Sequence, residues 1–242
     1  MPKHFYGNKP DKKDERDYLF RTLVPTLSLP PAVDLRPKAS PVRDQGQLGS
    51  CTGFAIAAGL REFMMFPLVP MSPLWLYYQE RVLEGSVGED AGAEIRDGMK
   101  VLQQMGCATE KAWHYKISKF TKKPSCTSTC GAKKYVIGSY HRLLNLEDIK
   151  LCLAADMGYV LGFTVYESFE SADVERTGNV PMPEAGEMML GGHAVFGVGY
   201  DDNTRRLTFK NSWGTGWGDA GYFTLPYEYL EIDPYIDIWT GI

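Results

Sequence analysis

The sequence predicts an α+β protein of two lobes, with helices in its first half and strands in its second. Between residues 51 and 105, apolar residues recur at helical spacing. Between residues 159 and 225, short apolar runs alternate with turn residues, which is typical of strands. A chain of 242 residues, 44% of them hydrophobic, is long enough to bury one large core or two smaller ones.

Three helices are expected in the first half. The alanine-rich run after Cys51 predicts a buried helix, and Ser72-Pro73 supplies an N-cap and a first-position proline for a second one reaching about residue 81. A third helix is expected over Ala93 to Met105, with one apolar face and Gly106 as its stop.

Strands dominate the second half. Lys134 to Tyr140 is expected to be a strand, and Asn145 to Ala155 a helix with a capping-box-like start. Further strands are expected at 159–166, from residue 193, at 206–211 and at 222–225. Residues 167–190 are expected to form a long polar loop, and loops of that length are more often functional than idle.

Charge and hydropathy exclude several classes of protein. The net charge of −4, with scattered Lys and Arg, indicates no nucleic-acid partner. The most apolar stretch, Leu68 to Tyr78, contains two prolines and is far shorter than the roughly 20 residues of a membrane span. The N-terminus lacks the apolar core of a secretory signal. We therefore expect a cytoplasmic location by default, with an extracellular one left open, and the sequence does not fix the oligomeric state.

The five cysteines leave at least one thiol outside any internal disulfide. Cys126 and Cys130 are close enough to form a local disulfide or to stay reduced, and both readings are open. No histidine has ligand-like spacing to this pair, so we expect no metal there. Cys107 and Cys152 lie in apolar patterns and are expected in the core.

Cys51 is the most informative residue of the chain. It ends a glycine-punctuated loop that begins at Gln45, and it precedes the first predicted helix. The partial positive charge of a helix N-terminus favours a thiolate, the reactive form of cysteine. Ser50 is expected to be the N-cap. Taken alone, Cys51 is as readily explained as an inert core thiol.

A nucleophilic thiol needs a base, and the base needs an orienting group. Of the four histidines, His193 begins a short apolar run flanked by glycines, which predicts a strand. A turn at Asp201 to Thr204 and a second strand ending near Asn211 complete a hairpin. This hairpin would place His193 opposite Asn211. Each residue alone has a structural explanation, but together they indicate a catalytic set.

The order Cys51, His193, Asn211, with the histidine 142 residues after the cysteine, resembles the papain-like cysteine peptidases. The run Asn211 to Tyr222 (NSWGTGWGDAGY) and the entry segment Val33 to Arg36 carry the same resemblance. It covers residues 33 to about 226. It implies a peptidase domain at 33–242, with a helical lobe at about 33–133, an antiparallel β-barrel-like lobe at about 134–242, and an active-site cleft between them.

The resemblance also implies roles at that cleft. Cys51 would be the nucleophile, His193 the base and acid, and Asn211 the group that orients the imidazole. The Gln45 amide and the Cys51 backbone N–H would form the oxyanion hole. Residues expected to bind a peptide or protein substrate are Gly49, Gly92, Gly192 and Trp213. The reaction needs no metal or organic cofactor.

Two positions depart from the family pattern. Thr52 stands where a tryptophan usually follows the nucleophile, and Leu48 stands where a cysteine usually forms a disulfide. We interpret them as marks of a divergent, microbial branch. They leave open an amidase, peptidoglycan hydrolase or acyltransferase with the same site, and a non-catalytic peptide-binding homologue.

Residues 1–32 form a lead-in that is first charged and then rich in proline and apolar residues. Proline biases its neighbours toward extended backbone. One reading is a tail lying on the surface. The other is a short pro-like segment, and we hypothesise that residues 1–32 pack along or near the cleft, because an extended apolar and proline-rich stretch directly precedes the domain.

Overall fold

The computed structural model describes residues 3–12, 14–15, 17–22 and 28–242. Its helices are α1 (Cys51–Gly53), α2 (Pro73–Glu84), α3 (Ile95–Gln104), α4 (Cys126–Ala132), α5 (Leu146–Ala154), α6 (Ala172–Thr177) and α7 (Tyr229–Ile232). Its strands are β1 (Asn8–Lys9), β2 (Ala32–Asp34), β3 (Ala93–Glu94), β4 (Tyr140–Arg142), β5 (Tyr159–Tyr166), β6 (Met189–Asp201), β7 (Arg206–Lys210), β8 (Tyr222–Pro226) and β9 (Asp237–Gly241). Single 3₁₀ turns lie at Phe20–Thr22, Arg36–Lys38, Ile117–Lys119, Lys133–Tyr135 and Glu167–Glu170.

The second half of the chain builds a seven-stranded sheet. The strand order is β4-β9-β5-β6-β7-β8, β2 pairs with β6, and each of these pairings is antiparallel. The central strand β5 is buried along nearly its whole length, which explains its continuous apolar sequence. The predicted hairpin from His193 to Asn211 is confirmed as β6 and β7, with Phe196 opposite Lys210.

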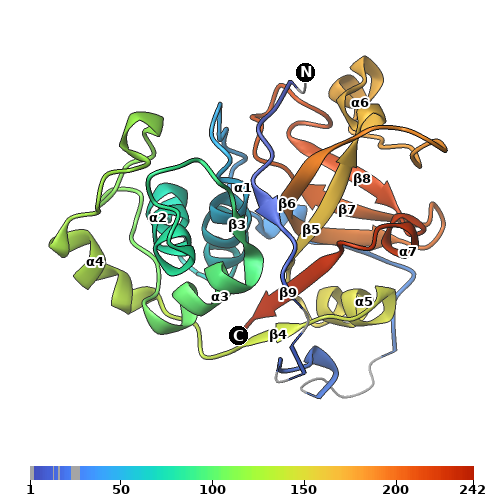
Figure 1. Cartoon of the computed structure of the whole chain (residues 1–242). Helices are drawn as coiled ribbons and strands as arrows, with labels where there is room; N and C mark the ends of the chain where they lie inside the picture. The colour runs from blue at the N-terminus through green and yellow to red at the C-terminus, as the bar shows by residue number, and fades with distance from the viewer. Residues whose placement is uncertain (1–2, 13, 16, 23–27) are drawn as a thin grey trace.

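Helices α1, α2 and α3 pack on one side of the molecule and the sheet lies on the other (Figure 1). α1 continues as a π-helical stretch, Phe54–Arg61, whose first seven residues are buried. Its Gly59 lies so close to the sheet that a β-carbon there would stand 2.6 Å from the β-carbon of Phe196. The small residues of this stretch thus bring the helix against β6.

The predicted second and third helices are confirmed. The Ser72 side chain accepts a hydrogen bond from the Trp75 amide at 3.1 Å, which caps α2. α3 buries Ile95, Met99 and Leu102 on one face, and Gly106 follows its end in the left-handed region at φ 77°.

Two predictions for loops and strands are wrong. Residues 134–140 form the end of a 3₁₀ turn and only the first residue of β4, because β4 is short and pairs with β9 at the far end of the chain. The expected loop at 167–190 contains a 3₁₀ turn and α6, which Ser171 caps at the Val174 amide. Helix α4, around Cys126 and Cys130, and strand β9 were not predicted.

The N-terminal segment, which we define as residues 3–22 where they are described, runs between the helices and the sheet. β1, drawn in blue, lies between β3 and the pair β5 and β6 in Figure 1. Asn8 is in parallel register with Ala93, and the Ala93 amide donates to the Gly7 carbonyl at 2.7 Å. Among the residues that the structure describes, no helix is long and apolar enough to cross a membrane.

Candidate active site

Cys51 is the first residue of α1, and its side chain is fully buried. The loop before it is fixed by Asp90, whose carboxylate accepts hydrogen bonds from the Gly49 amide at 2.9 and 3.1 Å. Ser50 occupies the N-cap position, but its side chain makes no capping bond. It bonds the Tyr115 hydroxyl at 2.7 Å instead, so the expected capping role of Ser50 is wrong.

His193 and Asn211 are in hydrogen-bond contact. His193 Nε2 lies 2.8 Å from Asn211 Oδ1, which also accepts from the Ser212 amide at 2.8 Å. Both side chains are buried. The second ring nitrogen, His193 Nδ1, has no hydrogen-bond partner among the described residues. Trp213 stacks on the imidazole, with ring centroids 4.9 Å apart. One ring nitrogen is therefore fixed and the other is left available.

The sulfur of Cys51 lies at the His193 end of β6. The backbones of Ala194, the residue after His193, and of Gly7 lie beside the thiol and act to lower its pKa. Burial nevertheless raises the pKa of Cys51 to about 11, and burial lowers the pKa of His193 to about 4. With the N-terminal segment in place, loss of solvent thus favours the neutral form of both groups. That the helix N-terminus favours a Cys51 thiolate stays a prediction.

Gln45 is fully buried, and its amide is held in one orientation. Ser212 Oγ donates to Gln45 Oε1 at 2.6 Å, which leaves Nε2 as the donor on the other side. That nitrogen donates to the Leu48 carbonyl at 2.9 Å and to the Phe5 carbonyl at 3.2 Å. The predicted oxyanion donor thus already holds a peptide carbonyl, and this carbonyl comes from the N-terminal segment.

The three glycines predicted to bind substrate all contact the same part of that segment. A β-carbon on Gly92 would stand 2.2 Å from the Gly7 carbonyl oxygen, and one on Gly192 would stand 2.3 Å from the Asn8 carbonyl oxygen. A β-carbon on Gly49 would be 3.4 Å from the Gly7 α-carbon. The backbone of residues 7 and 8 is therefore enclosed by the predicted substrate-binding residues.

Side chains of the segment complete the coverage. His4 stacks on Trp213 with ring centroids 3.7 Å apart, and the Tyr6 hydroxyl donates to Glu170 at 2.6 Å. The Lys3 amide also donates to Glu170, at 2.9 Å. The contacts of residues 3 to 8 thus support the hypothesis that the lead-in packs at this site.

The described residues of the proline-rich part, which suggested this hypothesis, lie elsewhere. The apolar, proline-rich part includes residues 23–27, which lie outside the described residues. The rest of it lies at the far end of β6, where the Tyr200 hydroxyl donates to the Pro30 carbonyl at 2.6 Å. Ala32 is there in register with Asp201. The charged, glycine-containing part reaches Cys51, because only a glycine fits against Gly49.

The sequence did not reveal several residues that position the site. Thr52, at the position where the family usually has tryptophan, donates through Oγ1 to the buried carboxyl of Glu80 at 2.7 Å. Ser212 orients Gln45, and Asp90 and Glu170 hold the loop and the N-terminal segment. The only signal for them was Ser212's place in the Asn211 motif.

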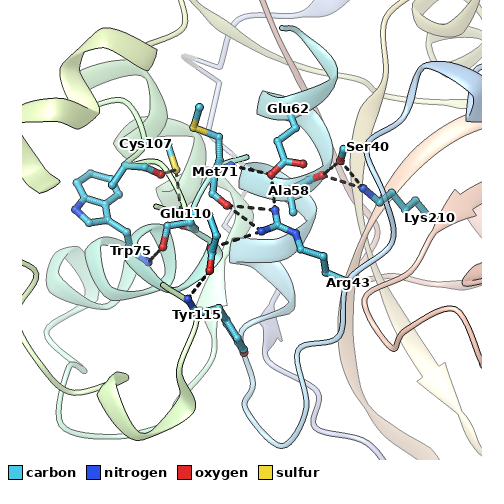
Figure 2. Close-up of polar contacts among 12 residues, drawn as sticks. Ser40, Arg43, Ala58, Glu62, Met71, Trp75, Cys107, Glu110, Tyr115 and Lys210 are labelled. Carbon is cyan, nitrogen blue, oxygen red and sulfur yellow. Dashed lines mark hydrogen bonds and ion pairs between the residues drawn. The ribbon is translucent and has the colours of Figure 1, made fainter. Parts of the chain in front are cut away.

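A polar cluster behind the site joins the helices to the sheet (Figure 2). Lys210, the residue before Asn211, donates to Ser40 Oγ at 2.7 Å and to the Ala58 carbonyl at 3.0 Å. Burial lowers the pKa of Lys210 to about 8. In the same cluster Arg43 pairs with Glu62 and donates to the Met71 carbonyl. The end of β7 is thereby tied to the helix that follows Cys51.

The remaining cysteines are all free thiols. Cys107 and Cys152 are buried as expected, whereas Cys126 and Cys130 are exposed on α4. Within the described residues, no group of three or more His, Cys, Asp or Glu side chains is arranged to hold a metal ion.

Comparison with known proteins decides the family. Residues 29–231 match the family described as papain family cysteine protease, which is most of the chain. The chain belongs to the papain family.

Individual relatives agree with this assignment. An uncharacterized peptidase C1-like protein of Acanthamoeba polyphaga mimivirus is 38% identical over 93% of this chain and 82% of its own length. The crystal structure of xylellain, a cysteine protease from Xylella fastidiosa, is 38% identical with a TM-score of 0.89, covering 99% of this chain and 96% of that one. A cathepsin B-like protein of Giardia intestinalis, CP3, is 28% identical over 93% of this chain and 82% of its length.

These findings establish the papain-like α+β fold and the activity of this family member. The chain is a cysteine peptidase, a hydrolase that acts on peptides or proteins. The viral and protist relatives fit a divergent microbial branch. These relatives do not favour an amidase or acyltransferase, and they do not favour a non-catalytic peptide-binding protein.

Proposed function

We propose that Cys51 is the nucleophile of this peptidase, with His193 as its base and acid and Asn211 as the orienting group. The observation that carries the proposal is the state of the His193 ring. Nε2 is fixed on Asn211 at 2.8 Å, Nδ1 has no partner among the described residues, and the backbone of the adjacent Ala194 lies beside the Cys51 thiol. An oriented base with one free nitrogen beside a thiol is what thioester chemistry requires.

In the proposed reaction, His193 Nδ1 takes the proton of Cys51 and the sulfur attacks the carbonyl carbon of the scissile peptide bond. The negative charge that develops on the carbonyl oxygen is stabilised by Gln45 Nε2 and the Cys51 backbone N–H. His193 then protonates the leaving amine, which departs and leaves a thioester on Cys51. His193 next activates water, which hydrolyses the thioester and frees the enzyme.

We further propose the division of the chain into residues 1–32, which include an intramolecular inhibitor, and a peptidase domain at 33–242. In support, residues 3–8 contact Gln45, His193, Trp213 and the glycines proposed to bind substrate. Gly49, Gly92, Gly192 and Trp213 would bind a substrate backbone once the segment has left. A substrate must then displace these residues, so the full chain is held inactive until the segment moves.

The register of the segment explains why it inhibits without being cleaved. Cleavage requires a single carbonyl group to meet both the sulfur and the oxyanion donor. The carbonyl on Gln45 Nε2 belongs to Phe5, whereas the segment backbone beside the Cys51 thiol is that of Gly7. The two requirements are met by different peptide units, so the bound segment is not in an attack geometry.

The test of the nucleophile is Cys51→Ala, with Cys126→Ala as the matched control because Cys126 is an exposed free thiol on α4. Both changes are made in a Gly7→Ala chain, because a β-carbon at position 7 would stand 1.8 Å from the Gly49 carbonyl oxygen and should displace the segment. They are assayed on an unfolded protein substrate, and circular dichroism verifies that they fold. We expect Cys51→Ala to lose turnover and Cys126→Ala to retain it. Cleavage by the folded Cys51→Ala chain at the rate of its Gly7→Ala parent would contradict the assignment.

A further inference from the structure

Two arginines from neighbouring elements meet under the N-terminal segment. Arg96 extends from α3 and Arg142 from β4, and their guanidinium carbons lie 5.6 and 4.2 Å from the ring centre of Trp239. Their side chains are only 10% and 11% exposed. Like charges this close and this poorly solvated repel each other strongly, so the pair needs anions to be stable.

The N-terminal segment supplies two of those anions. Asp11 Oδ2 lies 3.0 Å from Arg96 Nε and 2.5 Å from Arg142 Nη2. Asp17 Oδ2 lies 2.6 Å from Arg96 Nη2 and 3.0 Å from Arg142 Nε. Each carboxylate thus joins both guanidinium groups, and charge-assisted contacts of this kind are the strongest polar contacts in proteins.

One carboxylate of the peptidase domain also faces the arginines. Asp237, which begins β9, accepts from Arg142 Nη1 at 2.9 Å. With the segment in place, three carboxylates face two guanidinium groups, for a net charge of −1. In accord with this excess, burial and then the charge of Asp11 raise the pKa of Asp237.

Departure of the segment would reverse this balance. Asp237 alone would face the two arginines, and these three groups together would carry a net charge of +1. The exposed fractions of 10% and 11% are those with the segment bound, so its departure exchanges the charge-assisted contacts to Asp11 and Asp17 for water. Because these contacts are poorly solvated, we expect them to hold the segment more firmly than its exposed pair of Lys3 with Glu175, in which both side chains are about half exposed.

The chain on either side of the carboxylates is held as well. Lys9 Nζ pairs with Glu84 of α2 at 2.7 Å. On the other side, the Arg142 amide donates to the Tyr18 carbonyl at 2.8 Å. The residues at the arginines are thus continuous, through β1, with the residues that cover Cys51.

We propose that Arg96 and Arg142 form a docking site for a pair of carboxylates, whose occupant is the chain's own N-terminal segment, and that this site also accepts the same acidic sequence as a separate peptide. The site lies outside the catalytic residues and holds the segment from a distance. Its consequence for turnover, that loss of the carboxylates releases Cys51, rests on the proposed function. The binding itself stands on the contacts of Asp11 and Asp17.

The test is the full-length double variant Asp11→Asn/Asp17→Asn, which keeps the side-chain shapes and removes both charges. Glu15→Gln is the matched control, because Glu15 is an exposed acid of the same segment. The first readout is amide hydrogen exchange of residues 3–12 by mass spectrometry, and the second is the rate at which a peptidyl epoxide labels Cys51. We expect both rates to rise tenfold or more in the double variant and to stay at the wild-type value in the control.

A synthetic peptide of residues 3–22, added to the double variant, then tests binding in trans. It should restore slow labelling of Cys51, whereas the same peptide with both aspartates changed to asparagine should not at equal concentration. Equal exchange in the double variant and in Glu15→Gln, or equal effects of the two peptides, would overturn the proposal. If the double variant does not fold, the single variant Asp17→Asn decides, with an intermediate increase expected and none overturning the proposal.

The two readouts separate this inference from the proposed function. Fast exchange of residues 3–12 without labelling of Cys51 in any variant would support the docking site and refute the catalytic role of Cys51. Labelling of Cys51 in the wild type, with exchange unaffected by the aspartates, would do the reverse.

Discussion

Gly7 packs so tightly on Gly49 that a β-carbon at position 7 would stand 1.8 Å from the Gly49 carbonyl oxygen. The contact joins the backbone of the N-terminal segment directly to the loop that carries Cys51. Neither backbone has room to yield, since the Gly49 amide is held by Asp90 and the Gly7 carbonyl by the Ala93 amide. Residue 7 therefore reports on whether the segment is bound.

Gly7→Ala is expected to dislodge the segment around Cys51 while leaving Asp11 and Asp17 docked. The added methyl group cannot be accommodated, so the variant should label with a peptidyl epoxide on the order of tenfold faster than wild type. Gly88→Ala is the control, because a β-carbon there meets nothing within 4 Å. Labelling at equal rates in both variants would show that residues 3–8 do not limit access to Cys51.

Gln45→Ala is expected to lower kcat by about 10²–10³-fold, because removing one oxyanion donor typically costs that much. KM should change little, since the oxyanion forms only after substrate has bound. The assay needs a chain whose segment has been displaced, such as Gly7→Ala. An unchanged kcat would remove Gln45 from the proposed oxyanion hole.

Ser212→Ala tests whether Ser212 acts through Gln45. Its hydroxyl donates to Gln45 Oε1 at 2.6 Å and so fixes which end of the amide faces the substrate. We expect a smaller loss of kcat than for Gln45→Ala, and no further loss when the two changes are combined. Independent, multiplying losses in the double variant would mean that Ser212 contributes in another way.

The residues predicted from the sequence are those whose relation is local or carried by a motif. His193 and Asn211 lie on consecutive strands of one hairpin, so the turn between them was enough to place one near the other. Cys51 was found because a glycine-rich loop precedes an apolar helix. The helix caps at Ser72 and Asn145 were predictable for the same reason, because each cap involves residues three positions apart.

The features that the sequence did not predict depend on contacts between distant residues. β4 and β9 are short strands that pair across almost a hundred residues, and neither has a strong pattern of its own. In the sequence Asp11 is one acid of a charged tail, and only the fold shows its contacts with Arg96 and Arg142. Thr52 is noticeable in the sequence only because it stands where tryptophan is usual, and its hydrogen bond to Glu80 depends on the fold.

Glu80 also predicts how stability changes with pH. Its carboxyl is fully buried beside Thr52, and burial raises its pKa from 4.5 to about 8. Between these two values the folded chain binds more protons at Glu80 than the unfolded chain. The stabilisation from this group is therefore complete below pH 4.5 and is lost as the pH rises through 8. The slope is at most about 1.4 kcal/mol per pH unit.

Glu80→Gln should remove this slope, because the amide does not titrate and still accepts a hydrogen bond from Thr52 Oγ1. The measurement is urea unfolding of both chains at intervals from pH 5 to 8.5, and the quantity is the difference between their unfolding free energies. Relative to wild type, the variant should gain stability as the pH rises. Glu89→Gln, at an exposed position on the same side of the chain's helical half, should follow the wild type throughout. A constant difference between Glu80→Gln and wild type over the whole range would mean that Glu80 is ionised in the folded protein, and that its charge beside the Cys51 helix is compensated.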